Sequence, residues 1–406
     1  MAGRREEFDT VVVGGGFAGL AVSRALQAAG LSHLVFERDR PCQTWLTQRW
    51  DSFRMNTPNV LTVMPGEVYA GPAPEGAMTR DDFVARVLAY AATHALPVEA
   101  GAAVEAVERD DRGGFLVRTG QGVVRARTVV ATTGNLNIAQ RPAFAARLPA
   151  AVTQLDGSGY RNAADLRPGA VLVVGCGNSG AQIAEDLALA GRKVFLSTGR
   201  NGRVPRRYRG RDIILWLMET GRYDQPRSVR SGRPLLGATH TLSLGSLSGL
   251  GIVMLGRLTD VTASGTLVFA GDLDKNAAHA DAVSAAIRRE IDGHIAAKGI
   301  NAAPAAVDFA EAAPNRFPEP RINELDLAAR GIATVIWSVG LTGDYRWLRV
   351  PGATGADGQP AQSRCLSVQG VYFAGLDSLE ALKSGTIMVA ADESRRIAEH
   401  ITATAG

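Results

Sequence analysis

The sequence predicts an α/β fold with two parallel-stranded units, and two observations carry this prediction. The first is the run VVVGGG at residues 11–16, where an apolar strand breaks into glycines before the helix-like segment 18–29. The second is the return of the same order at residues 171–190. A strand, a glycine turn and a helix N-terminus together form a cradle for pyrophosphate. The chain is therefore predicted to hold two Rossmann-like dinucleotide-binding domains.

In the first unit, Gly14, Gly16 and Gly19 fill the three glycine positions of G-x-G-x-x-G. A second strand at residues 34–36 ends in Glu37, where a carboxylate can accept both ribose hydroxyls of an adenosine. The alternative is a glycine-rich turn that binds nothing. The acid at the strand end argues against that alternative.

Length and composition agree with a two-domain globular protein. The chain has 406 residues, 46% of them apolar and 21% charged, with a net charge of +4. This small net charge argues against nucleic-acid binding and against binding to a membrane surface. The segment 1–8 leaves no room for a signal peptide, and the apolar stretch 250–255 is too short to span a bilayer.

Cysteine usage indicates a reducing compartment. Cys42, Cys176 and Cys365 lie far apart without a C-x-x-C pair, which argues against dithiol–disulfide chemistry and against a structural zinc site. The six histidines are scattered without ligand spacing, so no metal is expected. We expect a cytoplasmic protein.

Between the two units, the segment 42–58 carries two tryptophans, two arginines and an Asn-Thr-Pro turn. It either contacts a ligand beside the glycine turn or buries its tryptophans against the sheet. Thr79 is the predicted cap of a helix running to residue 94. A meander of strands over 103–131 then ends in a small-residue turn that contains Thr133 and Gly134.

The second unit has the fingerprint GCGNSG at residues 175–180 and a second strand at 193–196. This strand is followed by Arg200 and by no acid, which favours the 2′-phosphate of NADP. Arginines 203, 206, 207, 209 and 211 are interpreted as a solvated loop. Residues 212–264 are expected to form helical or loop cover over the active site.

Later segments complete the predicted domains. A helix is expected over 278–298, an Ala/Pro-rich connection to the first domain over 303–320, and a buried strand over 334–339. A last strand at 371–374 ends in a glycine turn before a final helix over 385–401. The predicted boundaries are 1–165 with 310–406 for the first domain and 166–309 for the inserted second domain.

Together these residues resemble the flavin-containing monooxygenases, which are class B flavoprotein monooxygenases, and their bacterial FAD/NAD(P)-dependent relatives, over nearly the whole chain. The resemblance implies FAD contacts at Gly14, Gly16, Gly19, Glu37, Trp45, Val104 and Thr133. It implies NADPH contacts at Gly175, Gly177, Asn178, Ser179, Gly180 and Arg200. Further cofactor contacts are expected at Phe17, Ala18, Arg38, Gln43, Thr44, Arg49, Gly134, Gly340, Gly375 and Leu376. Asn56 matches the family asparagine beside the flavin, which helps to hold the oxygenated intermediate.

One motif departs from the family. The linker motif F-x-G-x-x-x-H-x-x-x-F/W should end at Tyr160, but Ala150, Val152 and Asp156 stand where Phe, Gly and His are expected. In the family this linker couples domain movement to the handling of NADP. The departure bears on the monooxygenase assignment and leaves the fold prediction unchanged.

The resemblance implies an NADPH-dependent monooxygenase that inserts one oxygen atom from O2 into a small organic substrate through a C4a-(hydro)peroxyflavin. The product would be an N-, S- or Baeyer-Villiger-type oxygenation product. A FAD-dependent NADPH oxidase or reductase is the first alternative, and a non-catalytic redox sensor is the second. The apolar stretch 242–255 either packs internally or forms the contact surface of a homodimer.

Overall fold

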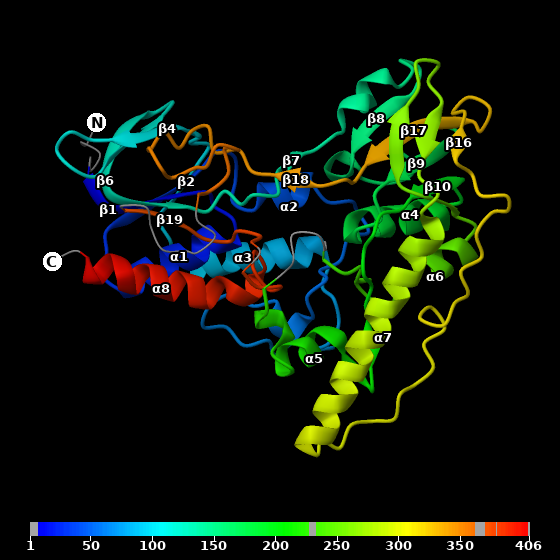
Figure 1. Cartoon of the computed structure of the whole chain (residues 1–406). Coiled ribbons are helices and arrows are strands. Elements are labelled where there is room, and N and C mark those ends of the chain that lie inside the picture. Colours follow the sequence, from blue (N-terminus) through cyan, green and yellow to red (C-terminus); the bar gives the residue numbers. More distant parts are fainter. Residues whose placement is uncertain (1–6, 227–232, 362–369, 379, 405–406) are drawn as a thin grey trace.

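The computed structural model describes residues 7–226, 233–361, 370–378 and 380–404. Figure 1 shows two lobes, with β7 (Ile138–Ala139) and β18 (Leu341–Thr342) between them. These two strands pair antiparallel, so the chain leaves the first lobe and returns to it along one short ladder. This arrangement confirms the predicted α/β fold with two Rossmann-like sheets.

The first lobe is built on a sheet in which β3, β2, β1, β6 and β19 run parallel in that order. The predicted meander forms the antiparallel part of this sheet, because β6 pairs antiparallel with β5 and β5 pairs antiparallel with β4. The strands are β1 (Glu7–Val13), β2 (His33–Glu37), β3 (Val98–Ala100), β4 (Val104–Arg109), β5 (Phe115–Thr119), β6 (Gly122–Ala131) and β19 (Val371–Phe373).

The uninterrupted apolar run in β1 follows from burial on both faces of this sheet. Val12 packs in one cluster with residues of α1 (Phe17–Ala28) and α8 (Ala390–Ala403). Val11 and Val13 face a second cluster that contains Phe115 of the meander. A third helix, α3 (Arg80–Thr93), begins at the predicted cap, where Thr79 Oγ1 accepts from Asp82 N at 3.1 Å.

The second lobe has a parallel sheet in the order β13-β10-β9-β17-β8. Its strands are β8 (Thr153–Asp156), β9 (Ala170–Val174), β10 (Val194–Ser197), β13 (Val253–Leu255) and β17 (Ile332–Trp337). Its helices are α4 (Asn178–Leu189), α6 (Leu244–Gly249) and the long α7 (Leu273–Lys298). A small antiparallel sheet of β14 (Leu258–Val261), β15 (Leu267–Phe269) and β16 (Glu324–Leu325) completes the lobe.

This sheet corrects the predicted domain boundaries. β8 and β17 lie within the segments assigned to the first domain, 1–165 and 310–406, yet they pair with each other and β17 pairs with β9. The second lobe therefore extends beyond 166–309 at both ends. The segment 303–320 leads to β16 and β17, and it does not return to the first domain.

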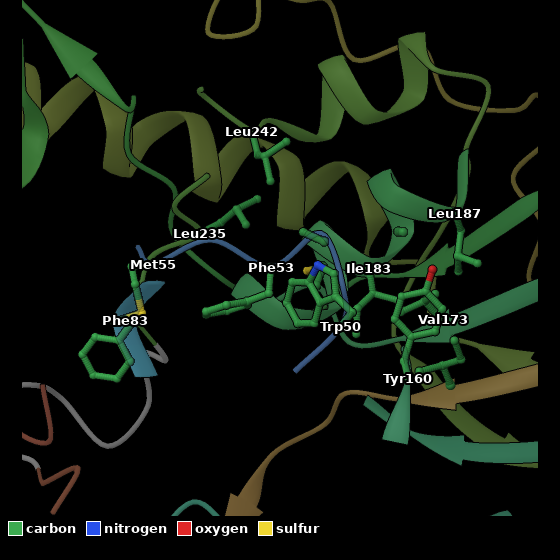
Figure 2. Packing of buried hydrophobic residues seen from close by; sticks show 14 of the residues in the cluster. Trp50, Phe53, Met55, Phe83, Tyr160, Val173, Ile183, Leu187, Leu235 and Leu242 are labelled. Carbon is green, nitrogen blue, oxygen red and sulfur yellow. The ribbon is translucent and has the colours of Figure 1, made fainter. Parts of the chain in front are cut away.

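An apolar cluster joins the two lobes (Figure 2). Trp50 and Phe53 come from the segment that follows α2 (Gln43–Thr47), and they share this cluster with Ile183 and Leu187 of α4. The stretch 242–255 contributes Leu247 among its buried residues, so much of that stretch packs internally. An apolar interface of this kind restricts the relative motion of two domains.

The short elements at the interface are β11 (Arg207–Tyr208), β12 (Arg211–Asp212) and α5 (Ile213–Glu219). A 3-10 turn at Arg222–Asp224 follows α5 and touches the C-terminal part of the first lobe. Lys383 N donates to Tyr223 O at 3.1 Å, and Leu382 N donates to Gln225 O at 3.2 Å. Part of the segment 212–264, which was predicted to cover the active site, therefore contacts the first lobe.

Candidate functional site

The first glycine turn has the shape that a pyrophosphate requires. Gly14 has a φ of +112°, and a Cβ on Gly19 would stand 1.9 Å from Gly14 O. These two glycines therefore allow β1 and α1 to approach closely. A Cβ on Gly16 would meet open space, and α1 begins there without a side-chain cap. The N–H groups of its first turn can then serve a bound anion.

Glu37 closes the adenosine end of the same turn. Its Oε2 accepts from Gly15 N at 2.7 Å, and its Oε1 accepts from Asp39 N at 3.0 Å. The carboxylate is thus fixed at the carboxyl end of β2, and it also lines the cavity described below. Its role toward the ribose hydroxyls of a bound adenosine stays a prediction.

A cavity of about 670 Å³ runs from Glu37 along the glycine turn to the C-terminal strand end. Its volume lies within the range of ligand pockets. The predicted cofactor residues that line it are Gly14, Gly16, Phe17, Ala18, Glu37, Arg38, Gln43, Thr44, Trp45, Arg49, Val104, Thr133, Gly134 and Gly375. The residues present therefore fit a dinucleotide such as FAD.

Apart from the NADPH residues of the second unit, three predicted cofactor residues do not line the cavity. Gly19 packs against β1, Leu376 is buried in the core of the first lobe, and Gly340 lies in the crossover between the lobes. Other lining residues were not predicted, and they include Cys42, Asn135, Asn137, Asp344, Arg346 and Gly385. Asn135 and Asn137 directly follow the predicted turn at Gly134, which is the signal that could have identified them.

Aromatic side chains surround Trp45 at one side of this cavity. The Trp45 ring centroid lies 4.7 Å from that of Phe83 and 6.1 Å from that of Phe53. Trp45 also lines the cavity. Trp45 therefore packs against aromatic neighbours and also faces the candidate site, and its contact with a ligand stays a prediction.

Asn56 is not among the residues that line the cavity. Its Oδ1 accepts from Gln182 Nε2 of α4 at 3.0 Å, and its carbonyl oxygen accepts from Arg206 Nη1 at 2.8 Å. Asn56 is therefore bonded to the second lobe. Its predicted place beside the flavin stays a prediction.

The second glycine turn repeats the geometry of the first. Gly175 has a φ of +102°, and a Cβ on Gly180 would stand 1.9 Å from Gly175 O. α4 begins at Gly177 without a side-chain cap, and Ser179 lies in its first turn. The side chain of Asn178 accepts from Leu236 N at 2.9 Å, so it also orders the chain that covers α4.

Arg200 lies beyond the end of β10 and is exposed. Among the described residues, its side chain makes no hydrogen bond or ion pair, which leaves it available to a phosphate. Two of the other arginines differ from the prediction of a solvated loop, whereas Arg207 is exposed and Arg209 and Arg211 are partly exposed. Arg203 pairs with Glu311 and Arg206 pairs with Asp212, and both arginines are 4% exposed. These charges are buried because acids from α7, its following segment and β12 enclose them.

The altered linker motif is well ordered by other contacts. Asp156, which replaces the expected histidine, accepts from Arg141 Nε at 2.6 Å. Tyr160 is fully buried, and its hydroxyl donates to Asp186 Oδ2 of α4 at 2.5 Å. Ala150 and Val152 lie in the turn before β8. The linker is thus attached to the NADPH-type helix without the family histidine.

Across the described ranges, no three His, Cys, Asp or Glu side chains gather as they would around a metal ion. None of the described helices is both long and apolar enough to cross a membrane. A separate cavity of about 750 Å³ lies between α1 and α8, and it contains none of the predicted cofactor residues.

Known proteins similar to this chain include an oxidoreductase and a monooxygenase. The chain is 29% identical over 372 residues to an uncharacterised CzcO-like oxidoreductase of Geobacillus kaustophilus, covering 91% of this chain and 90% of that protein. It is 34% identical over 198 residues to the indole-3-pyruvate monooxygenase YUCCA1 of Oryza sativa subsp. japonica, covering 47% of this chain and 48% of that protein.

A flavin-containing monooxygenase from Stenotrophomonas maltophilia has the same fold, with a TM-score of 0.67 and 18% identity over 99% of this chain and 100% of that one. The profile of the pyridine nucleotide-disulphide oxidoreductase family matches residues 11–216, which include both glycine fingerprints. The chain therefore belongs to the pyridine nucleotide-disulphide oxidoreductase family.

Proposed function

We propose that this oxidoreductase is an NADPH-dependent FAD monooxygenase, which transfers one oxygen atom from O2 to a small organic substrate. FAD occupies the cavity, with its ribose at Glu37 and its pyrophosphate at the start of α1. NADPH binds at the start of α4, with Arg200 at its 2′-phosphate. Bound FAD supplies hydride acceptance and the activation of O2, while the chain binds, orients and excludes water.

The observation that carries this proposal is the state of Cys42. It is the described cysteine that lines the cavity, and it is free. Burial, with a smaller contribution from Glu37, raises the pKa of its thiol to about 12, so the thiol stays protonated and a poor nucleophile. The other described cysteine, Cys176, lies in the second lobe and is also free. Cys365 lies outside the described residues, and within them no pair of cysteines stands ready to take electrons from reduced FAD, which favours an external acceptor such as O2.

Relatives support oxygen transfer as the outcome. The rice protein that matches half of this chain is named an indole-3-pyruvate monooxygenase. The indole-3-pyruvate of its name is a 2-oxo acid, so a 2-oxo acid belongs in the first substrate panel. The cytoplasm is the proposed compartment, since it keeps thiols reduced. Association into a homodimer remains a prediction.

A NADPH oxidase or reductase is the second candidate. It is favoured by Asp156, which stands in place of the family histidine in the linker before the second glycine turn. The two candidates consume the same NADPH and differ in their oxygen products.

The test is the balance of NADPH, O2 and hydrogen peroxide with a panel of a 2-oxo acid, a sulfide, an amine and a ketone. A monooxygenase incorporates one labelled atom from 18O2 into one of these substrates, and its peroxide yield then falls below the NADPH consumed. One peroxide per NADPH with every substrate class, and no labelled product, rejects the proposal in favour of the oxidase.

A further inference from the structure

Arg49 is a partly buried cation that has no acidic partner among the described residues. It follows α2 and lines the cavity, with its guanidinium 5.0 Å from the Trp45 ring centroid and 5.7 Å from that of Phe53. Its side chain donates to Gln48 O at 2.8 Å. Within the part of the chain that the structure describes, no carboxylate lies within ion-pair distance of Arg49. The nearby Arg80, by contrast, pairs with Asp51 and Asp81.

The charge on Arg49 is costly in this position. Burial, together with the neighbouring Arg161, lowers the pKa of Arg49 to about 10, and the side chain is still cationic at neutral pH. A buried charge without a counter-ion destabilises the protein unless a ligand supplies the opposite charge. Because Arg49 lines the cavity, that anion is expected on the molecule that fills it.

Contacts of the main chain show which end of the cavity Arg49 occupies. Its carbonyl oxygen accepts from Arg161 Nη1 of the linker at 3.2 Å. Two and three residues further on, Asp51 N donates to Arg161 O and Ser52 bonds to Asp186 of α4. Arg49 therefore lies toward the second lobe, where NADPH would bind.

The opposite end of the cavity is fixed by Glu37, which bonds to Gly15 N within the first glycine turn. A dinucleotide placed with its ribose at Glu37 and its pyrophosphate at α1 directs its other ring toward the second lobe. The pyrophosphate already has the N–H groups of α1, whereas Arg49 is left for the redox-active ring.

We propose that Arg49 stabilises the negative charge that the flavin ring acquires on reduction. This inference rests on FAD binding in the cavity, which is part of the proposed function. A hydride from NADPH carries two electrons and one proton to the ring and leaves NADP+, so the neutral ring becomes an anion. The cation at Arg49 then favours the reduced over the oxidised cofactor, and it raises the reduction potential of the bound flavin.

The experiment measures the midpoint potential of bound FAD by dye equilibration, and the affinity for oxidised FAD by fluorescence. Arg49→Met keeps the packing stem and removes the charge, Arg49→Lys keeps the charge, and Arg49→Gln replaces the Met variant if that variant does not fold. Arg54→Gln is the matched control, because Arg54 is exposed and bonds to Ala77 O away from the cavity.

We expect Arg49→Met to lower the preference for reduced over oxidised FAD by about tenfold, which corresponds to about 30 mV for a two-electron couple. Arg49→Lys should retain most of the potential, and Arg54→Gln all of it. An unchanged potential with weaker binding of both redox forms would place Arg49 at the pyrophosphate and overturn the inference. An unchanged potential with unchanged affinity overturns it as well.

This result is separable from the proposed activity. If the Arg49 variants shift the potential but no substrate receives oxygen, the inference stands and the monooxygenase proposal fails. If the wild-type protein does not retain FAD, both fail.

Discussion

Breaking the pair formed by Arg206 and Asp212 should destabilise the protein strongly. The side chains are 5% and 0% exposed, and Arg206 also donates to Asn56 O and Gly237 O. Replacing Arg206 with Met leaves the Asp212 carboxylate buried without its cation. Removal of one partner of a buried pair costs about 3 to 5 kcal/mol. We expect Arg206→Met to lower the free energy of unfolding by this amount.

The assay is urea unfolding, followed by circular dichroism and by tryptophan fluorescence, which includes Trp216 on α5. Arg54→Met is the control, because substitution of an exposed side chain changes stability by about 0.5 kcal/mol or less. In the double variant Arg206→Met with Asp212→Asn, the asparagine can still accept from Ile214 N and carries no charge. It should recover about 1 to 2 kcal/mol relative to the sum of the single changes. A cost below about 1 kcal/mol for Arg206→Met, or strict additivity, refutes the reasoning.

Three further predictions concern the cofactor domains. Asn56→Ala should leave FAD bound and raise the peroxide released per NADPH, and unchanged coupling would remove Asn56 from the mechanism. Arg200→Ala should raise KM for NADPH about tenfold and leave KM for NADH unchanged, since only NADPH carries the 2′-phosphate; an equal rise for both contradicts this role. Burial raises the pKa of Glu393, which accepts from Gly375 N, from 4.5 to about 7. The folded state then binds more protons between these values, so stability should fall as pH rises from 4.5 to 7, and Glu393→Gln should flatten that slope. A wild-type protein without the slope contradicts the assignment.

Local patterns predicted the parts of the site that are made from neighbouring residues. Gly14 and Gly19 meet within one turn, Glu37 ends the adjacent strand, and Thr79 caps the helix that begins after it. Each of these features depends on a short segment and on backbone geometry that few residue types satisfy. Local patterns and the family resemblance together were therefore sufficient to place the glycine turn and about half of the residues that line the cavity.

Pairing between strands or charged side chains that are far apart in the sequence could not be predicted from such local patterns. The apolar run in β17 predicted a buried strand, but it did not reveal that Thr334 pairs with Thr153, which moved both strands into the second lobe. Arg203 and Arg206 were interpreted as solvated because charged side chains are usually exposed. Their burial depends on Glu311, which lies 108 residues from Arg203, and on the packing of the chain around Asp212.

Asn56 was predicted from a local pattern, whereas its side-chain partner is a long-range contact that the sequence did not reveal. Its Oδ1 is held by Gln182, a side chain on the same helix whose first turn contains the NADPH-type fingerprint. Because the oxygen accepts this bond, the amide nitrogen keeps its two donors for another group. The bond to α4 therefore orients the Asn56 amide while leaving it able to donate. Gln182→Leu should accordingly raise peroxide release as Asn56→Ala does, if Asn56 acts at the flavin. If only Asn56→Ala uncouples the reaction, the contact with α4 is structural, and the orientation of Asn56 depends on its carbonyl bond to Arg206.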